Sequence, residues 1–221
     1  MQYLSVAEAQ KNVLESVSEQ SIEMVKLEQS LGRVLAEDVK ANRDLPPYDV
    51  SAMDGFAVRS VDMVEAPKIL EIVEDIRAGD MPSQSLQQGQ CARIMTGAPV
   101  PQGADAVIRV EETEALEGEK VQINSVVKPG NDIRLRGENM GQGDVVLASG
   151  TEITPGVIGI LATVKRAQIE VYRRPSVAIL STGDELEGLD EPIDPNKIPD
   201  ANSHALMAQV QALGIEPVML G

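Results

Sequence analysis

The loop over residues 45–58 carries the first residue types that can do chemistry. Its sequence, LPPYDVSAMDGFAV, places Asp49, Ser51 and Asp54 close to a glycine. Glycine lets the backbone approach a ligand closely, and a carboxylate can hold a cation or move a proton. The same mixture of proline, aspartate and glycine also forms ordinary turns, so a binding loop and a simple connection both fit this pattern.

A second segment offers donors for an anion. In RIMTGAPVPQGADAV, residues 93–107, Thr96 and Gly97 stand at the expected end of a strand. Backbone amides at such a turn can point toward an anion, and the Thr96 hydroxyl adds a further donor. The alternative is a turn between strands that is stiffened by its prolines.

Basic residues gather in a third segment, although the chain as a whole is acidic. KPGNDIRLRGEN, residues 128–139, contains Lys128, Arg134 and Arg136. An arginine can grip a phosphate through two parallel hydrogen bonds. Basic residues are also common on solvated surfaces, so a phosphate site and an ordinary surface fit this segment equally.

Acidic residues follow an apolar run in the last part of the chain. SVAILST, residues 176–182, is typical of a strand buried on both faces of a parallel sheet, and it leads into STGDELEG, residues 181–188. Open α/β sheets bind ligands at the carboxyl ends of such strands, where Asp184 and Glu185 could hold a divalent cation. Acidic residues in this place also serve solubility.

Capping signals predict the helices that must position these segments. Ser5 and Glu8 form a capping box in front of apolar residues at helical spacing, which predicts a helix to about residue 19. Thr154, followed by a proline, begins a second helix. A third helix is expected over about 202–213, closed by a glycine.

Short apolar runs that are broken by turn residues predict the strands. A long loop, punctuated by Pro-Pro and Asp-Gly, is expected over 41–55. The expected strands cover residues 68–76, 90–95, 105–112, 120–127, 144–150, 168–172, 176–182 and 215–220. The chain therefore combines a β-rich middle with mixed helix and strand on either side.

Composition narrows the classes of protein. The 221 residues include 35 acidic and 19 basic ones, for a net charge of −16, and only 2% are aromatic. Nucleic-acid binders have the opposite charge, so no nucleic-acid partner is expected. One Cys and one His exclude a zinc site built from Cys and His and a disulfide within the chain. Without a signal-peptide pattern or a long apolar run, we expect a cytoplasmic protein and no membrane association.

Some single residues have simpler expected places. Cys91 is expected to be a small buried residue, and His204 is expected on the surface. Met residues should mostly fill the core, except Met53 and Met95, which flank the candidate segments. Two parallel strands with one crossover helix would leave apolar faces uncovered, so we expect the natural chain to continue beyond Gly221.

The four candidate segments resemble, in order, those of the MoeA family of molybdopterin molybdenumtransferases, to which the E domain of gephyrin is also similar. The resemblance covers essentially the whole chain. It rests on DVSAMDGFAV (49–58), RIMTGAPVPQGADAV (93–107), the stretch from KPG to RGEN (128–139) and RPSVAILSTGDEL (174–186).

The resemblance implies an α+β multi-domain fold and a homodimer. A mixed α/β first domain, used for dimerisation, would comprise residues 1–44 and 128–173. An inserted β-rich second domain would comprise 45–127, and 174–221 would begin a parallel-sheet α/β third domain of molybdopterin-binding type. The active cleft would lie between the third domain of one subunit and the second domain of its partner.

The resemblance also implies a reaction in molybdenum cofactor biosynthesis. Molybdate is inserted into adenylylated molybdopterin with Mg²⁺, AMP is released, and the protein that adenylylates molybdopterin is the upstream partner. The implied catalytic residues are Asp54, Thr96 and Glu185, with the acids assigned to metal or proton handling and the threonine to anion contact. The implied cofactor-binding residues are Ser51, Gly97, Arg134, Arg136, Thr182 and Gly183, and the implied metal ligands are Asp184 and Glu185.

Two positions depart from the family pattern. Val50 replaces the amide of the usual DNSAMDG, and Asn139 replaces the acidic residue of RGED. Asparagine cannot act as a base, so a non-catalytic dimeric scaffold of the same family is the alternative function. The retained Asp54, Thr96 and Glu185 favour the enzyme, and the lack of a GxxxxGKS loop disfavours a generic nucleotide-binding domain. By themselves, these 221 residues are expected to have little or no transferase activity.

Overall fold

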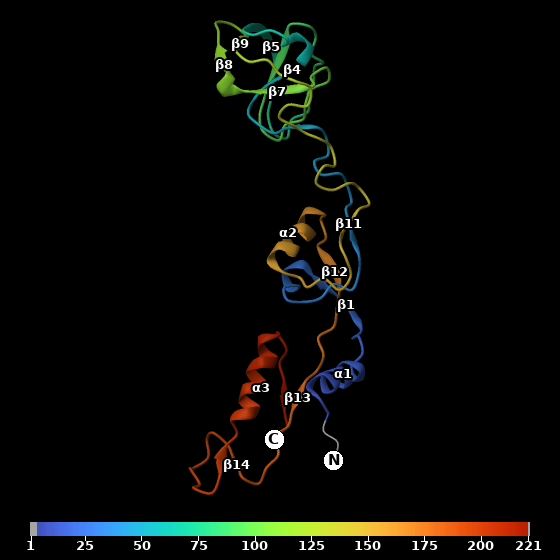
Figure 1. Cartoon of the computed structure of the whole chain (residues 1–221), viewed down its shortest axis with the longest axis vertical. Helices are drawn as coiled ribbons and strands as arrows, with labels where there is room; N and C mark the ends of the chain where they lie inside the picture. The colour runs from blue at the N-terminus through green and yellow to red at the C-terminus, as the bar shows by residue number, and fades with distance from the viewer. Residues whose placement is uncertain (1–3, 221) are drawn as a thin grey trace. The chain divides into compact units, whose positions relative to one another are not determined.

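The chain forms two compact units in the computed structural model, which describes residues 4–220. The central unit is Lys40–Asp144, and the flanking unit joins Met1–Val39 to Val145–Gly221. In Figure 1 the central unit contains the curled sheet on which β4, β5, β7, β8 and β9 are labelled.

Six strands form the sheet of the central unit, in the order β7-β4-β6-β5-β9-β8. Neighbouring strands run antiparallel, except β5 and β6, which run parallel. The strands are β4 (Gly55–Val58), β5 (Lys68–Ile76), β6 (Gln90–Ile94), β7 (Ala106–Arg109), β8 (Thr113–Ala115) and β9 (Lys120–Ile123). One-turn 3₁₀ helices η2 (Ser60–Asp62) and η3 (Val110–Glu112) follow β4 and β7.

The structure confirms the strands predicted over 68–76 and 90–95 and shortens the next two. The strand predicted over 105–112 ends at Arg109, where the chain turns into η3, and the Val110 amide donates to the Asp54 carbonyl at 3.0 Å. The strand predicted over 120–127 ends at Ile123.

Apolar side chains of this sheet form two buried clusters. Alternate residues of β4 belong to different clusters, as the two-residue period of a strand requires. Cys91 is fully buried, as predicted, and this burial raises the pKa of its thiol to about 12. One cluster contains Phe56, Val58, Met63, Leu70, Cys91, Ala106, Ile108, Val121 and Ile123. The other contains Ala57, Ile76, Leu86, Ala92, Ile94, Ala98 and Val107.

A short strand pair joins the candidate segments of the central unit. β3 (Val50–Ser51) lies within the loop predicted over 41–55 and pairs antiparallel with β10 (Ile133–Arg134). The pairing brings the DVSAMDG and RLRGEN segments together. β2 (Val39–Lys40) pairs with β11 (Val145–Leu147), which belongs to the flanking unit and is the part of the strand predicted over 144–150 that forms.

The flanking unit begins with the predicted capped helix. α1 (Val6–Ser16) has the capping box of Ser5 and Glu8 and ends a few residues before the expected residue 19. The 3₁₀ helix η1 (Leu27–Gln29) follows β1 (Ile22–Lys26), which pairs antiparallel with β12 (Gln168–Tyr172). α2 (Pro155–Thr163) starts after the predicted cap residue, Thr154.

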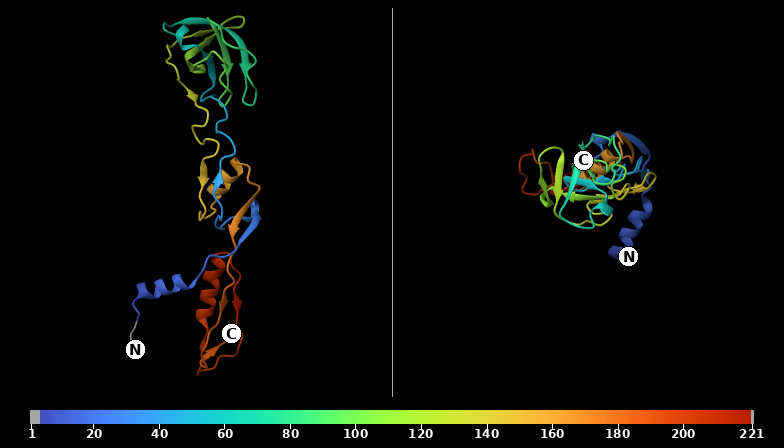
Figure 2. Two further views of the ribbon diagram at one scale, coloured as in Figure 1. Left: turned by 90° about the vertical axis from the view of Figure 1, so that its right-hand side faces the viewer. Right: turned by 90° about the horizontal axis from the view of Figure 1, so that it is seen from above.

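The last part of the chain contains two short parallel strand pairs and a helix. β13 (Ala178–Ile179) pairs with β16 (Val218–Met219), and β14 (Leu186–Glu187) pairs with β15 (Ile198–Pro199). α3 (Ala201–Ala212) packs beside β13, as Figures 1 and 2 show, and its His204 is exposed, as predicted. The strand predicted over 176–182 forms only at β13, and its place in a parallel strand–helix–strand unit is confirmed by its pairing with β16. Burial on both faces was wrong for the described chain: Leu180 is exposed, as two parallel strands with one helix leave apolar faces uncovered.

Mixed helix and sheet confirm the predicted α+β class. The division into three domains, at 1–44 with 128–173, 45–127 and 174–221, stays a prediction beside the observed compact unit Lys40–Asp144. Every helix within residues 4–220 is too short or too polar to span a lipid bilayer.

Candidate functional site

The sheet of the central unit brings Asp54 and Thr96 together. β4 begins at Gly55, which pairs in register with Ile94, the last residue of β6. The residues just outside these two strand ends therefore meet at one edge of the sheet. The Thr96 amide and hydroxyl both donate to Oδ1 of Asp54, each at 2.7 Å.

These two hydrogen bonds favour the ionised form of Asp54. They lower the pKa of the Asp54 carboxyl, first through the Thr96 amide and then through its hydroxyl, and the charge of Arg93 lowers it further. Hydrogen bonds to the charged form favour that form. Asp54 is therefore an exposed carboxylate at neutral pH, with one oxygen fixed in position.

Ser51 and Gly97 connect the two loops that carry this pair. The Gly97 amide donates to the Ser51 carbonyl at 2.8 Å, and the Ser51 amide donates to the Ala98 carbonyl at 2.9 Å. The buried Ser51 hydroxyl donates to the Met53 carbonyl at 2.5 Å. Gly97 has φ +82°, a left-handed conformation that glycine adopts without strain. These contacts give both residues a structural role, and their role in cofactor binding stays a prediction.

Gly55 explains the Asp-Gly pair of the motif. A Cβ on this residue would lie 1.9 Å from the carbonyl oxygen of Ile108 on β7. No side chain fits at that distance, so only glycine can follow Asp54 at the start of β4.

The two predicted phosphate-binding arginines are paired with polar neighbours. Arg134 donates from Nε to Glu138 at 2.6 Å and from Nη2 to Asn139 at 2.8 Å. Arg136 donates from Nε to Asp44 at 2.5 Å. Their side chains are 44% and 65% exposed, so both guanidinium groups can still be reached from solvent.

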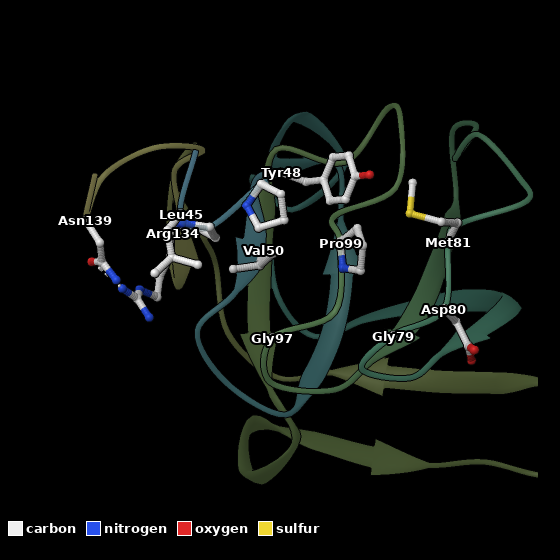
Figure 3. Close-up of a pocket in the computed structure, with 12 residues that line it drawn as sticks. Leu45, Tyr48, Val50, Gly79, Asp80, Met81, Gly97, Pro99, Arg134 and Asn139 are labelled. Atoms are coloured by element: carbon white, nitrogen blue, oxygen red, sulfur yellow. Dashed lines mark hydrogen bonds between the residues drawn. The ribbon is translucent and has the colours of Figure 1, made fainter. Parts of the chain in front are cut away.

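Arg134 and Asn139 also line one end of a mostly apolar pocket of about 420 Å³, and Met81 lies at the other end in Figure 3. Sequence reasoning missed most of this lining. Tyr48 is the signal that could have found this pocket, because it lies in a candidate loop and the chain has only 3 tyrosines and 1 phenylalanine. The lining residues are Leu45, Pro46, Pro47, Tyr48, Val50, Gly79, Asp80, Met81, Gly97, Pro99, Arg134 and Asn139.

The remaining predicted residues lie in the flanking unit. Thr182 and Glu185 line a pocket of about 510 Å³ at the start of α3. The Glu185 carboxylate lies over Gly183, since a Cβ on that glycine would be 2.7 Å from Oε2. Asp184 does not line this pocket. Nowhere in residues 4–220 do three or more His, Cys, Asp or Glu side chains form a group that could hold a metal ion.

Asp200 is a residue of this second pocket that sequence reasoning missed. It is the N-cap of α3, and it accepts hydrogen bonds from the Ser181 hydroxyl and the Ser203 amide. These bonds, with that of Ser181 the largest contribution, lower its pKa to about 2. Its position directly before the predicted third helix was the available signal.

Comparison with family models matches residues 4–164 to the MoeA N-terminal region, its domains I and II. The molybdopterin molybdenumtransferase of Nostoc sp. (strain PCC 7120) is 44% identical over 208 residues, which cover 92% of this chain and 48% of the relative. That of Bacillus subtilis (strain 168) is 40% identical over 225 residues, covering 99% of this chain and 52% of the relative. The chain thus spans about half the length of the curated relatives it matches.

Solved structures give the same relationship. The crystal structure of the molybdopterin biosynthesis moeA protein from Pyrococcus horikoshii OT3 is 34% identical, with a TM-score of 0.87, over 97% of this chain and 58% of that one. A second moeA structure from Pyrococcus has a TM-score of 0.81 at 31% identity, over 100% of this chain and 57% of that one. With a family match over residues 4–164 and the four segments in their expected order, the chain belongs to the MoeA family.

Proposed function

We propose that this chain forms part of a molybdopterin molybdenumtransferase, an enzyme of molybdenum cofactor biosynthesis that inserts molybdate into adenylylated molybdopterin and releases AMP. The observation that carries the proposal is the Asp54 carboxylate, which two donors of Thr96 fix in an exposed position within the DVSAMDG segment. The names of the relatives from Nostoc and Bacillus support the class of reaction.

The central unit offers features that suit a phosphate-bearing ring system. Arg134 lies at one end of the apolar pocket, so a flat ring can rest against Tyr48 and Pro99 while a phosphate faces the guanidinium group. Arg136, which is more exposed, would add positive charge beside it. The ionised Asp54 would accept hydrogen bonds from donor groups of the substrate, and it would not supply a proton.

Mg²⁺ is part of the proposed reaction, and Asp184 and Glu185 are the residues proposed to hold it. The donor chemistry fits, because Mg²⁺ prefers oxygen ligands and is usually held by one or two carboxylates together with substrate phosphates. The Glu185 carboxylate adjoins the second pocket. When bound, the ion would offset the negative charge of those phosphates.

The two departures from the family pattern are compatible with a working site. Val50 is buried and forms the β3 pair with Arg134, so an apolar side chain suits its place. Asn139 accepts a hydrogen bond from Arg134, which its amide oxygen can do without a charge. These contacts weigh against the non-catalytic scaffold. The homodimer and the upstream adenylylating partner remain part of the proposal on the family resemblance alone.

The test uses a chain that is completed to the length of the relatives. We would join these 221 residues to the C-terminal part of the Bacillus subtilis relative and measure AMP release from adenylylated molybdopterin with molybdate and Mg²⁺. The completed chain should release AMP, and the 221-residue chain alone should release little or none. Asp54→Asn should lower kcat/KM by about 100-fold, the scale of removing one electrostatic contact of an active site.

The matched control is Asp75→Asn, on an exposed residue of β5. It makes the same change in charge on the same sheet and should leave the rate within about twofold of the parent, as surface substitutions usually do. If Asp54→Asn keeps full activity with unchanged circular dichroism, Asp54 is not part of the site, and the proposal loses the observation on which it rests.

A further inference from the structure

Asp54 lies in a three-residue loop, Ala52–Asp54, whose two ends are held by residues outside the motif. At the first end, the Ala52 amide donates to the Asp132 carbonyl at 2.8 Å. At the second end, the Val110 amide donates to the Asp54 carbonyl at 3.0 Å. The position of the loop therefore depends on where Asp132 and the end of β7 lie.

Arg109 links these two supports. It is the last residue of β7, and its guanidinium donates to both carboxylate oxygens of Asp132, from Nε at 3.0 Å and from Nη2 at 3.1 Å. Such two-point pairs fix geometry as well as charge. We call this pair the Arg109–Asp132 fork. The Asp132 side chain is 17% exposed and the Arg109 side chain is 46% exposed, so the carboxylate is half-buried while the guanidinium group stays open to solvent.

Asp132 has a backbone that needs outside support. Its φ is +49°, in the left-handed region that only a few per cent of residues other than glycine adopt. The Asn131 side chain donates to the same carboxylate at 3.2 Å and to the Val107 carbonyl at 3.0 Å, which attaches the segment to β7 a second time. The Asp132 carbonyl accepts from the Ala52 amide. The side chains of Arg109, on β7, and of Asn131, the residue before Asp132, therefore hold this carbonyl in its direction.

We infer that Arg109 and Asp132 are positioning residues for Asp54: the fork holds the loop Ala52–Asp54 in the place where the Asp54 carboxylate meets both donors of Thr96. The hydrogen bonds of the Asp54 side chain come from Thr96, and those that join the loop to the fork are backbone bonds, so the effect passes through the backbone. The inference deepens the proposed function, and only its expected effect on catalysis rests on that proposal.

The first measurement is amide hydrogen exchange, by nuclear magnetic resonance, on the 221-residue chain. In Arg109→Gln, exchange of the Thr96 and Ala52 amides should be about tenfold faster or more, because a charged hydrogen-bonded pair is lost. The buried sheet residues Ala57 and Ala92 report on the general stability of the unit, and their exchange should stay within about twofold of the parent.

Two further variants separate positioning from loss of stability. Asparagine tolerates the left-handed backbone and keeps one acceptor oxygen. Asp132→Asn should therefore speed exchange of the Thr96 amide, by less than Arg109→Gln does. Arg59→Gln is the matched control, because Arg59 pairs at 3.7 Å with Asp62, a residue of η2 in the same unit, and not with the loop or the fork. It should leave the Thr96 amide unchanged. If Arg109→Gln also speeds exchange of the Ala57 and Ala92 amides, the Thr96 exchange rate in Asp132→Asn decides whether the fork positions the loop.

The second measurement is AMP release by the completed chain. Arg109→Gln should lower kcat by about 10- to 100-fold, as misplacement of a reacting group does, with KM within about twofold of the parent. The inference is overturned if Thr96 exchange is unchanged in both fork variants, if Arg59→Gln raises it equally, or if only KM changes. If the completed parent chain releases no AMP, the proposed function fails, while the exchange rates still decide the positioning role.

Discussion

At the scale of single residues, this protein fixes carboxylates with hydrogen bonds, at the exposed Asp54 and at Asp44, whose side chain is 19% exposed. Asp54 is held by Thr96, Asp44 by the Gln142 amide and then by an arginine, and the pKa of each is lowered as a result. A charge held in this way keeps its ionised form and its direction, although the surrounding water screens its interactions with distant groups. Both properties suit a site that receives a charged substrate from solution.

The Thr96 hydroxyl can be removed almost without a change in shape. In Thr96→Val, the pKa of Asp54 should rise toward the ordinary value of 3.8 but stay below it, because the backbone amide still donates. Since a lowered pKa stabilises the folded state above the unfolded value, this contribution should be lost as the pH falls through the folded pKa. A titration of the carboxyl carbon by nuclear magnetic resonance measures the shift. An unchanged midpoint would contradict the role of the hydroxyl.

At the scale of elements, the sequence signals that proved right are local ones. The capping box of Ser5 and Glu8 and the cap at Thr154 depend on residues three apart, and the strands over 68–76 and 90–95 follow from short apolar runs. These patterns need no knowledge of the rest of the fold.

Apart from the N-cap Asp200, the features that sequence analysis missed depend on contacts between distant segments. The Arg109–Asp132 fork joins residues 23 apart, and the pocket joins the loop around Tyr48 to the loop around Met81. The basic residues 134 and 136 stood out because they form a cluster, whereas an isolated Arg109 gave no signal. Pairing of Asp54 with Thr96 needed the register of β4 and β6, which spacing alone does not supply.

Contact between β4 and β7 leaves no space for a side chain at Gly55. Gly55→Ala should lower the free energy of unfolding by about 3 kcal/mol or more, because the new Cβ meets backbone and the strands must separate. Gly159→Ala, in α2 with open space around it, should raise it by about 1 kcal/mol. Urea unfolding of both variants checks the contrast. Equal stability of Gly55→Ala and the parent would contradict the close approach.

At the scale of the whole molecule, the net charge of −16 opposes the binding that the site is proposed to perform. The field of 35 acidic residues against 19 basic ones repels a phosphate-bearing substrate before it reaches the protein. Positive charge near the pocket therefore has to come from Arg134 and Arg136, and further charge from the proposed Mg²⁺. The segment 128–139 supplies three of the 19 basic residues of this acidic chain, two of them beside the pocket.

The same excess of negative charge should make the folded chain more stable as salt is added. Raising the ionic strength from about 0.01 to 0.15 M shortens the screening length from about 30 to about 8 Å, which weakens repulsion across the molecule more than it weakens close pairs such as the Arg109–Asp132 fork. The thermal midpoint should rise by a few degrees in sodium chloride, measured at constant pH by circular dichroism. Potassium chloride should act alike, because screening does not depend on the identity of the cation. A midpoint that falls with salt would mean that close ion pairs stabilise the folded chain by more than the repulsion between its acidic residues destabilises it.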